Sequence, residues 1–383
     1  MRRTLLALST AAALTFGGLA TAAPAQSARG PAPGTPTPVT AANLLSPLSL
    51  ATGRDGSLYV SQNFAGVLDR VDARGNVTPL ATKTAPGAEI GAVSYRRGLT
   101  FYAENTGAGP DPAPNTGVIK TISASGQVRT VGDVAAFELS RNPDGKVTYG
   151  FRNLPAACLA QVPAEARGTY QGEADSHPYA TLPTRSQVYV ADAGGNDIVA
   201  VNRYTGRVRL VATLPATPLK VTAALATSTG LPACAVGYTY SLEAVPTDVV
   251  RGRDGWLYVS TLPGGPEDPS LGALGRIYRV NPWTGQVRLF ASGLVNPTGL
   301  AVNDRGDVYV AELFGGRVSV IPRGSTTPRP FVSVPLPADV AIQGNTLYIT
   351  TNALPGEGTP PAGQVVKVAL GRGSGCWHHE DAD

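Results

Sequence analysis

The amino-acid sequence predicts an all-β protein, a six-bladed β-propeller closed by an N-terminal strand that completes the last blade. Three observations predict it: a strand pair that recurs, a spacing of about 40 residues between copies, and a composition suited to many short strands. The 383 residues include 45 Gly, 33 Pro and 14 Tyr, and 15% are charged. Such a composition is typical of strands joined by tight turns rather than of helices.

The clearest copy of the repeat is VNPTGLAVNDRGDVYV, at 295–310. It consists of an apolar strand, a polar turn and a second strand that ends in Tyr309 and Val310. Two further strands follow each pair, as in 276–290, and four strands per repeat make one propeller blade. The second strands of the six units lie at 58–60, 100–102, 188–190, 257–259, 308–310 and 347–349.

The two ends of the repeat region indicate how the ring closes. The last unit stops after its third strand, 364–368, and lacks a fourth. Residues 38–42 precede the first unit, where an outer strand is expected. This strand therefore completes blade six, and ring closure hides strand edges that promote aggregation.

Two stretches interrupt the spacing, at about 136–176 and 217–243. The first is long enough for a seventh blade, but no third and fourth strands follow, so an insertion is favoured. Each insertion carries one cysteine, Cys158 and Cys234, in connections expected on the same face of the ring. We expect a disulfide between them, with two free thiols as the alternative; the third cysteine, Cys376, lies in a polar tail.

Residues 1–25 have the pattern of a secretory signal peptide. Arg2 and Arg3 precede a short apolar core, and small-residue cleavage sites end at Ala22 or Ala25. The remainder divides into a linker (26–37), a single propeller domain (38–370) and a flexible tail (371–383). No later stretch is apolar for long enough to span a bilayer, so we expect a secreted or periplasmic bacterial protein.

Composition and motifs exclude several function classes. The net charge of +4 is small, and no run of Lys and Arg is present, so nucleic acid is not an expected partner. His177 is the sole histidine outside the tail, and no nucleophile elbow or Ser-His-Asp set is recognisable. The glycine pairs lack the helix that a phosphate-binding loop requires. We expect a monomer that binds a small molecule or a protein.

Several segments carry a family resemblance. They are NPDG at 142–145, YGF at 149–151, VADAGGN at 190–196, LPAC at 231–234, and PTD at 246–248 followed by DGWLYV and TLPGGPE up to 267. These residues resemble the ScyD/ScyE family of exported bacterial propellers, named from the scytonemin (sunscreen pigment) biosynthetic cluster. The repeat is also similar, more loosely, to NHL-type and gluconolactonase/strictosidine-synthase-like propellers. The resemblance implies a six-bladed propeller and no settled activity.

Carboxylates are expected around the central channel. The residue after Pro-Thr or Pro-Ala in each first strand faces the channel, and it is Asp248 in blade four, Asp339 in blade six and Gly299 in blade five. Glu89 begins the first strand of blade two at nearly the same level. Converging carboxylates suit Ca²⁺ or another divalent cation, and gluconolactonase-like propellers hold their catalytic metal with Glu, Asn and Asp on such strands. Alternatively, these carboxylates accept hydrogen bonds from neighbouring amides in a wet channel.

A second polar ring follows the second strands of the blades: Gln62, Glu104, Asp192, Thr261, Glu312 and Thr351. From this ring we expect Glu104, Asp192 and Glu312 to contact a ligand at the channel mouth, together with Glu267 from a Gly/Pro-rich loop. The alternative is that acidic residues after a strand stabilise the turn.

The predicted function is an exported binding or scaffold protein that holds a small molecule or partner at a mouth capped by both insertions. The alternative is a Ca²⁺-dependent lactonase or hydrolase of the gluconolactonase kind, with Glu89, Asp248 and Asp339 around the ion. Whether the protein is an enzyme stays open at this stage.

Overall fold

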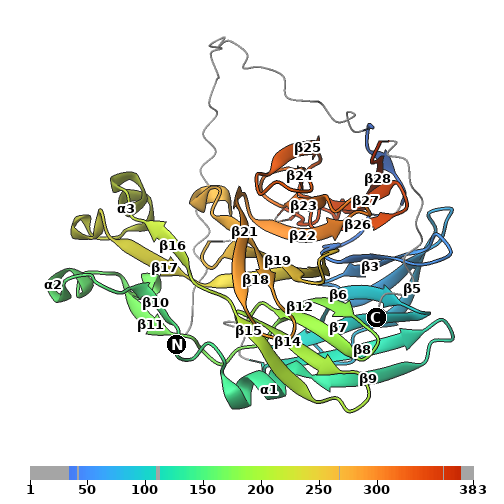
Figure 1. The fold of residues 1–383 in the computed structure, drawn as a ribbon, viewed down its shortest axis with the longest axis horizontal. Helices are drawn as coiled ribbons and strands as arrows, with labels where there is room; N and C mark the ends of the chain where they lie inside the picture. The colour runs from blue at the N-terminus through green and yellow to red at the C-terminus, as the bar shows by residue number, and fades with distance from the viewer. Residues whose placement is uncertain (1–33, 41–42, 109–112, 267, 357, 372–383) are drawn as a thin grey trace, which may run out of the picture.

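The computed structural model describes residues 34–40, 43–108, 113–266, 268–356 and 358–371. The described strands form seven antiparallel sheets of four strands each. Six of these sheets are the blades of the propeller, and Figure 1 shows them arranged around a common centre. The predicted signal peptide, the tail beyond residue 371, Cys376 and Glu267 lie outside the described residues.

Each blade runs from an inner strand at the channel to an outer strand at the rim. The first three blades contain β2 (Leu50–Thr52), β3 (Leu58–Gln62), β4 (Val67–Val71) and β5 (Val77–Thr82); β6 (Glu89–Arg96), β7 (Leu99–Thr106), β8 (Thr116–Ser123) and β9 (Val128–Asp133); and β12 (Pro178–Pro183), β13 (Gln187–Asp192), β14 (Asp197–Asn202) and β15 (Val208–Thr213). The next two contain β18 (Ala244–Arg251), β19 (Leu257–Pro263), β20 (Gly275–Val280) and β21 (Val287–Leu294); and β22 (Pro297–Val302), β23 (Val308–Glu312), β24 (Arg317–Ile321) and β25 (Arg329–Ser333).

Blade six closes the ring with an N-terminal strand as predicted, although this strand lies at Thr37–Pro38 and not at 38–42. It contains β26 (Val340–Gln343), β27 (Thr346–Thr351), β28 (Gln364–Ala369) and, as its outermost strand, β1 (Thr37–Pro38). Thr37 lies opposite Lys367, and the amide of Val39 donates to Val365 O at 2.8 Å. The inner strands contact one another in the cyclic order β2, β6, β12, β18, β22, β26 and back to β2.

The hydrophobic core is divided among the six seams between blades. One cluster lies at each seam: Tyr59 with Ile90, Phe101 with Val190, Tyr189 with Leu257, Ile277 with Val310, Tyr309 with Leu347, and Val365 with Leu58. The alternating apolar residues of each strand supply these faces. Burial at every seam holds the ring closed without one central core, which leaves the centre open.

The seventh sheet is not a blade. It combines strands from both predicted insertions in the order β11 (Thr169–Gln171), β10 (Thr148–Phe151), β17 (Thr239–Leu242) and β16 (Thr217–Lys220). In Figure 1 this insertion sheet projects sideways from the ring next to blades three and four. The expectation that the insertions cap the channel mouth is therefore not met, because their strands pair with each other and extend away from the ring.

Helices are few and short among the described residues. They are α1 (Val134–Arg141), α2 (Ala156–Leu159) and α3 (Ala223–Thr229), with 3-10 turns η1 (Ala164–Ala166), η2 (Ala233–Ala235) and η3 (Pro269–Leu271). Asp133 caps α1 by accepting a hydrogen bond from the amide of Ala136. None of the described helices is long and apolar enough to cross a membrane.

Candidate functional site

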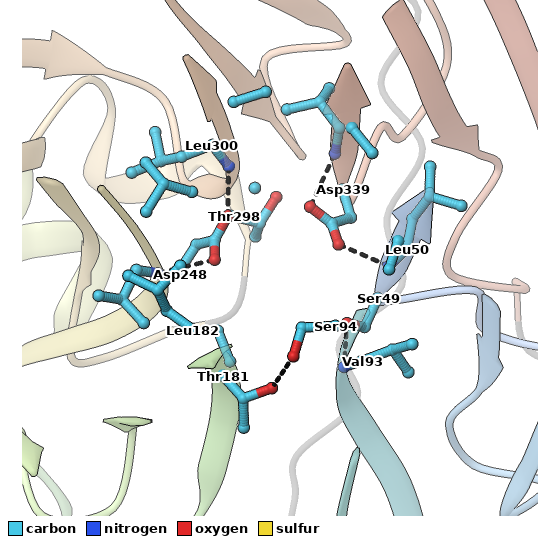
Figure 2. Close-up of a pocket in the computed structure, with 18 of the residues that line it drawn as sticks. Ser49, Leu50, Val93, Ser94, Thr181, Leu182, Asp248, Thr298, Leu300 and Asp339 are labelled. Carbon is cyan, nitrogen blue, oxygen red and sulfur yellow. Dashed lines mark hydrogen bonds between the residues drawn. The ribbon is translucent and has the colours of Figure 1, made fainter. Parts of the chain in front are cut away.

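The candidate site is the central channel, a cavity of about 350 Å³ lined by the inner strands of all six blades. Figure 2 shows two carboxylates from different blades at this cavity, Asp248 and Asp339, with hydroxyl groups near them. Among the lining residues are Ser49, Ser94, Thr181, Thr247 and Thr298. The channel therefore presents mostly hydrogen-bond acceptors and hydroxyls on an apolar wall.

Asp248 connects blade four to blade five. The amide of Val249 donates to its Oδ1 at 2.7 Å, and the amide of Leu300 in the next blade donates to Oδ2 at 2.6 Å. A shift in the β18–β19 register between Pro246 and Asp248 marks a bulge at this point. Bulges redirect side chains, which accounts for the turn of this carboxylate toward the neighbouring blade.

Asp339 makes the same connection from blade six to blade one. Its Oδ1 accepts from the amide of Val340 at 2.7 Å, and its Oδ2 accepts from Leu50 at 2.6 Å. Ser49 continues the series, because its Oγ accepts from the amide of Val93 in blade two at 2.7 Å. These bonds match the alternative in which the channel carboxylates accept from neighbouring amides.

Gly299 is small because its neighbour occupies the space. A Cβ at this position would lie 2.4 Å from Asp339 Oδ1 and 2.6 Å from Asp339 Cα. The difference between blade five and its neighbours is thus a packing requirement: the glycine lets Asp339 approach the strand and reach Leu50.

The two aspartates share an electrostatic environment. Burial raises the pKa of Asp248 to about 7, although the two amide bonds act in the opposite direction. Burial, and then the negative charge of Asp248, raises the pKa of Asp339 well above its ordinary value. The pair therefore retains a proton near neutral pH, and a cation that enters the channel competes with that proton.

Glu89 lies in a different environment from the two aspartates. Asn63 Nδ2 donates to its Oε2 at 2.8 Å, and His177 Nε2 lies 3.5 Å from the same oxygen. Burial lowers the pKa of His177, but the hydrogen bond and charge of Glu89 outweigh it, so the net shift is upward. Throughout the described part of the chain, no three or more His, Cys, Asp or Glu side chains form a group ready to hold a metal ion.

The predicted ligand-binding acids at the strand ends are buried and partnered. Lys120 Nζ donates to Glu104 at 2.6 Å, Arg317 Nε donates to Glu312 at 2.7 Å, and Ser176 Oγ donates to Asp192 at 2.6 Å. This arrangement favours the alternative in which they stabilise the strand ends, and ligand contact stays a prediction. Glu267 lies outside the described residues.

Sequence reasoning missed part of the channel wall. Ser94 and Thr181, from blades two and three, lie 2.6 Å apart through their hydroxyl oxygens, and Thr181 Oγ1 donates to Ala92 O. The β6–β7 register shifts between Gly91 and Ser94. Simple alternation along the strand therefore does not identify which hydroxyl faces the channel.

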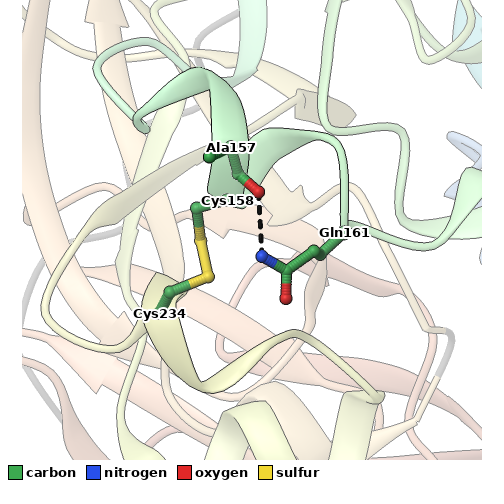
Figure 3. Close-up of a disulfide and its surroundings, with 4 residues drawn as sticks. All are labelled: Ala157, Cys158, Gln161 and Cys234. Atoms are coloured by element: carbon green, nitrogen blue, oxygen red, sulfur yellow. Dashed lines mark hydrogen bonds between the residues drawn. A yellow bond between two sulfur atoms is a disulfide. The ribbon is translucent and has the colours of Figure 1, made fainter.

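The expected disulfide is present. Cys158 in α2 and Cys234 in η2 are joined with a Cα–Cα distance of 5.9 Å, and Figure 3 shows the bond between the two insertions. Phe151, Val221 and Ala235 pack around it. The crosslink therefore belongs to the insertion sheet, at a distance from the channel wall, and joins two segments separated by blade three in the sequence.

Comparison with solved structures finds β-propeller proteins at low sequence identity. A PQQ-bound aldose sugar dehydrogenase from Streptomyces coelicolor is similar with a TM-score of 0.52 and 15% identity, over 87% of this chain and 96% of that one. A gluconolactonase from Xanthomonas campestris gives 0.52 and 12%, over 87% and 88%. A putative glucose dehydrogenase from Thermus thermophilus gives 0.50 and 14%, over 87% and 99%. Likeness at these identities shows the fold alone.

No protein-family profile matches the chain, and no curated protein sequence matches it.

Proposed function

We propose that this protein is an exported binding propeller of the ScyD/ScyE type that holds a small ligand with a cationic amine in its central channel. The observation that carries the proposal is the pair Asp248 and Asp339, each held in place by two short amide hydrogen bonds and facing one cavity. Acceptors fixed in this way lose little freedom when a donor arrives, and preorganisation of this kind favours binding.

The charge of the channel supports a cationic ligand. Arg251 is the one basic side chain among the described residues that line the cavity, whereas two carboxylates face it. A protonated amine that enters the channel displaces the proton that this pair retains and restores charge balance. Because the pKa of Asp248 is about 7, we expect binding to strengthen as the pH rises through neutrality.

Export is supported by the disulfide between Cys158 and Cys234, since such bonds persist mainly in oxidising compartments. Together with the predicted signal peptide, it supports a secreted or periplasmic location.

The alternative function is a metal-dependent lactonase. The acidic pair in the channel favours it, and the gluconolactonase that shares the fold motivates the choice of substrate. The position of Glu89 weighs against a three-carboxylate metal set, because its carboxylate is engaged by Asn63 and His177.

The test uses the intact processed protein and two matched probes, putrescine and its neutral isostere 1,4-butanediol. Calorimetry is expected to detect putrescine and not the diol, with weaker binding at pH 5.5 than at pH 8. The double variant Asp248→Asn/Asp339→Asn is expected to lose at least about tenfold in affinity, whereas exposed Asp304→Asn retains it.

Equal binding of putrescine and the diol, or binding that does not depend on pH, contradicts the cationic site. Ca²⁺-dependent hydrolysis of gluconolactone that is abolished by Asp248→Asn would establish the alternative.

A further inference from the structure

A second group of acidic side chains lies away from the channel, at the seam between blades two and three. Glu138 comes from α1, Asp144 from the turn after it, Asp192 from the end of β13 and Asp197 from the start of β14. All four are fully buried, with 0% exposure. They lie where the ring meets the root of the insertion sheet, since Tyr149 of β10 donates to Asp144 Oδ2 at 3.0 Å.

Two of these carboxylates have no hydrogen-bond partner at all among the described residues. Both oxygens of Glu138 and both oxygens of Asp197 are buried and unpartnered. Asp192, by contrast, accepts from Ser176 Oγ and from the amide of His177. An isolated carboxylate in such surroundings is strongly unfavourable when ionised.

The electrostatics agree with this geometry. Burial, followed by the charges of Asp192 and Asp144, raises the pKa of Glu138 to about 8. Burial and the charge of Asp192 raise the pKa of Asp197 well above its ordinary value. Without a bound cation, the carboxyl groups of Glu138 and Asp197 must therefore be protonated to remain buried at neutral pH.

In blades five and two, a basic side chain neutralises the buried acid of the second strand, and blade three lacks such a side chain at this position. In blade five, Glu312 lies opposite Arg317 in the strand register and forms an ion pair at 2.7 Å. Blade three has the same register, with Asp192 opposite Asp197. In blade two, Glu104 of β7 is paired with Lys120 at 2.6 Å. Blades five and two thus place Arg317 and Lys120 beside their acids, whereas blade three places a second carboxylate, Asp197, beside Asp192.

A neutral side chain gives an independent indication of a ligand. Asn196 is 2% exposed, its Nδ2 donates to Asp144 Oδ2 at 2.9 Å, and its Oδ1 has no partner among the described residues. The amide thus lies against the acidic group with an unsatisfied oxygen. Asn196 adopts a φ of 54°, where blades one and five have Gly66 and Gly316, so the amide is present despite a backbone that favours glycine.

Close glycines make room for the carboxylates. A Cβ on Gly195 would lie 3.0 Å from Glu138 Oε2, and a Cβ on Gly172 would lie 2.1 Å from Asp144 Oδ1. A side chain at Gly172 would therefore require Asp144 to move, and one at Gly195 would fit tightly against Glu138.

We propose that a hard divalent cation of the Ca²⁺ class binds in this seam between Glu138 and Asp197, with Asn196 Oδ1 as a further ligand. Carboxylate and amide oxygens are the ligands that Ca²⁺ prefers, and its coordination geometry is adaptable. Within the described part of the chain, three acids are not already gathered as a ready set, so the ion draws Glu138 and Asp197 toward it by side-chain rotation. The bound ion supplies the charge that Arg317 supplies in blade five, and it links blade three to α1, the helix that precedes the insertion sheet.

The test is the thermal unfolding of the intact protein, stripped with EDTA and then titrated with Ca²⁺. Addition of about 1 mM Ca²⁺ is expected to raise Tm by about 5 °C, with a smaller rise for Mg²⁺. The channel variant Asp248→Asn/Asp339→Asn is expected to keep this response, which separates the seam from the channel proposal. Asp197→Asn is expected to remove the response and to raise the Tm of the stripped protein.

Two further variants keep the test decisive if Asp197→Asn does not fold. Asn196→Gly retains the backbone type of blades one and five and is expected to weaken Ca²⁺ binding about tenfold. Asp197→Arg installs the pairing of blade five and is expected to unfold at a temperature independent of Ca²⁺. Absence of a Ca²⁺ response in the wild type, or an equal response in Asn196→Gly, overturns the proposal.

Discussion

Blades three and five use one backbone design with opposite charge at one position. Both end their second strand with a buried acid and begin the third strand directly across from it, but the residue there is Arg317 in blade five and Asp197 in blade three. Blade five is neutralised by its own chain. Blade three is not, and it is also the blade flanked by both insertions. The difference between the two blades is informative because it leaves a buried negative charge in blade three without a cation from the chain.

The largest expected effect is a pH dependence that originates in Glu138 of α1, which is buried beside blade three. A carboxyl group with a raised folded pKa contributes stability that is complete below its unfolded pKa and is lost as the pH rises through the folded pKa. For Glu138, with a folded pKa of about 8, the free energy of unfolding in EDTA is expected to fall by roughly 4 kcal/mol between pH 4.5 and pH 8.5. Urea titrations across this range measure the change.

The matched control for this pH dependence is Glu138→Gln, which cannot ionise and is expected to remove the share of Glu138 and make the profile shallower, while Asp197 and the channel pair keep their own shares. Saturating Ca²⁺ is expected to do the same in the wild type. A profile that stays steep in Glu138→Gln would assign the effect to other groups, such as the channel pair.

The second effect is obtained by giving blade five the charge pattern of blade three. Arg317→Asp leaves the fully buried Glu312 beside a second acid and is expected to lower the free energy of unfolding by about 3 kcal/mol. Arg329→Asp, an exposed change of the same charge in the next strand, is expected to alter it by less than about 0.5 kcal/mol. Similar losses in the two variants, by chemical denaturation, would show that net charge rather than the buried pair is responsible.

The third effect isolates the insertion sheet that accompanies blade three. Cys158→Ser/Cys234→Ser is expected to cost about 2–3 kcal/mol, because the bond closes a long segment of chain with a sequence separation of 76. Hydrogen exchange is expected to accelerate in β10, β11, β16 and β17 and to remain slow in the inner strands. Uniform acceleration over all blades would show that the insertion sheet and the ring unfold together.

The smallest effect concerns blade two, in which Lys120 of the same sheet neutralises Glu104. Lys120→Met removes the 2.6 Å ion pair with Glu104 but leaves the donors from Thr84 in place. We expect a loss of about 1 kcal/mol in thermal unfolding, less than for blade five, since Glu104 keeps these other hydrogen bonds. Lys83→Met, at a neighbouring position, is the control. A loss larger than that of Arg317→Asp would reverse the ranking of the blades.

The fold was predictable because its signals are local. Alternation in each strand, the turn residues and the repeat spacing predict six blades, and the missing fourth strand after 364–368 predicts closure by the N-terminal strand. The insertion sheet was not predictable, since β10 and β17 pair across a whole blade and are four residues long each. Nothing in either short segment specifies its distant partner.

The candidate site was predictable in part for the same reason. The repeat register indicated Asp248 and Asp339, and both line the central cavity. The amide partner of Asp248 in blade five depends on bulges in β18 and β22 that alternation does not reveal. Glu138 was missed because it sits in a short helix after a run of strands, where a lone acid resembles an ordinary surface residue. Its burial results from the packing of α1 against β8 of blade two and β15 of blade three.

The outer strand of blade six has a consequence for the order of folding. The Thr37 hydroxyl donates to the Lys367 carbonyl across 330 residues. Neighbouring blades can pair as they leave the ribosome, but the ring stays an open arc until β28 exists to receive β1. Contacts of such long sequence separation are slow to form. Closure therefore waits until β28 is made, and the outer edge of β28 is exposed from then until β1 pairs with it.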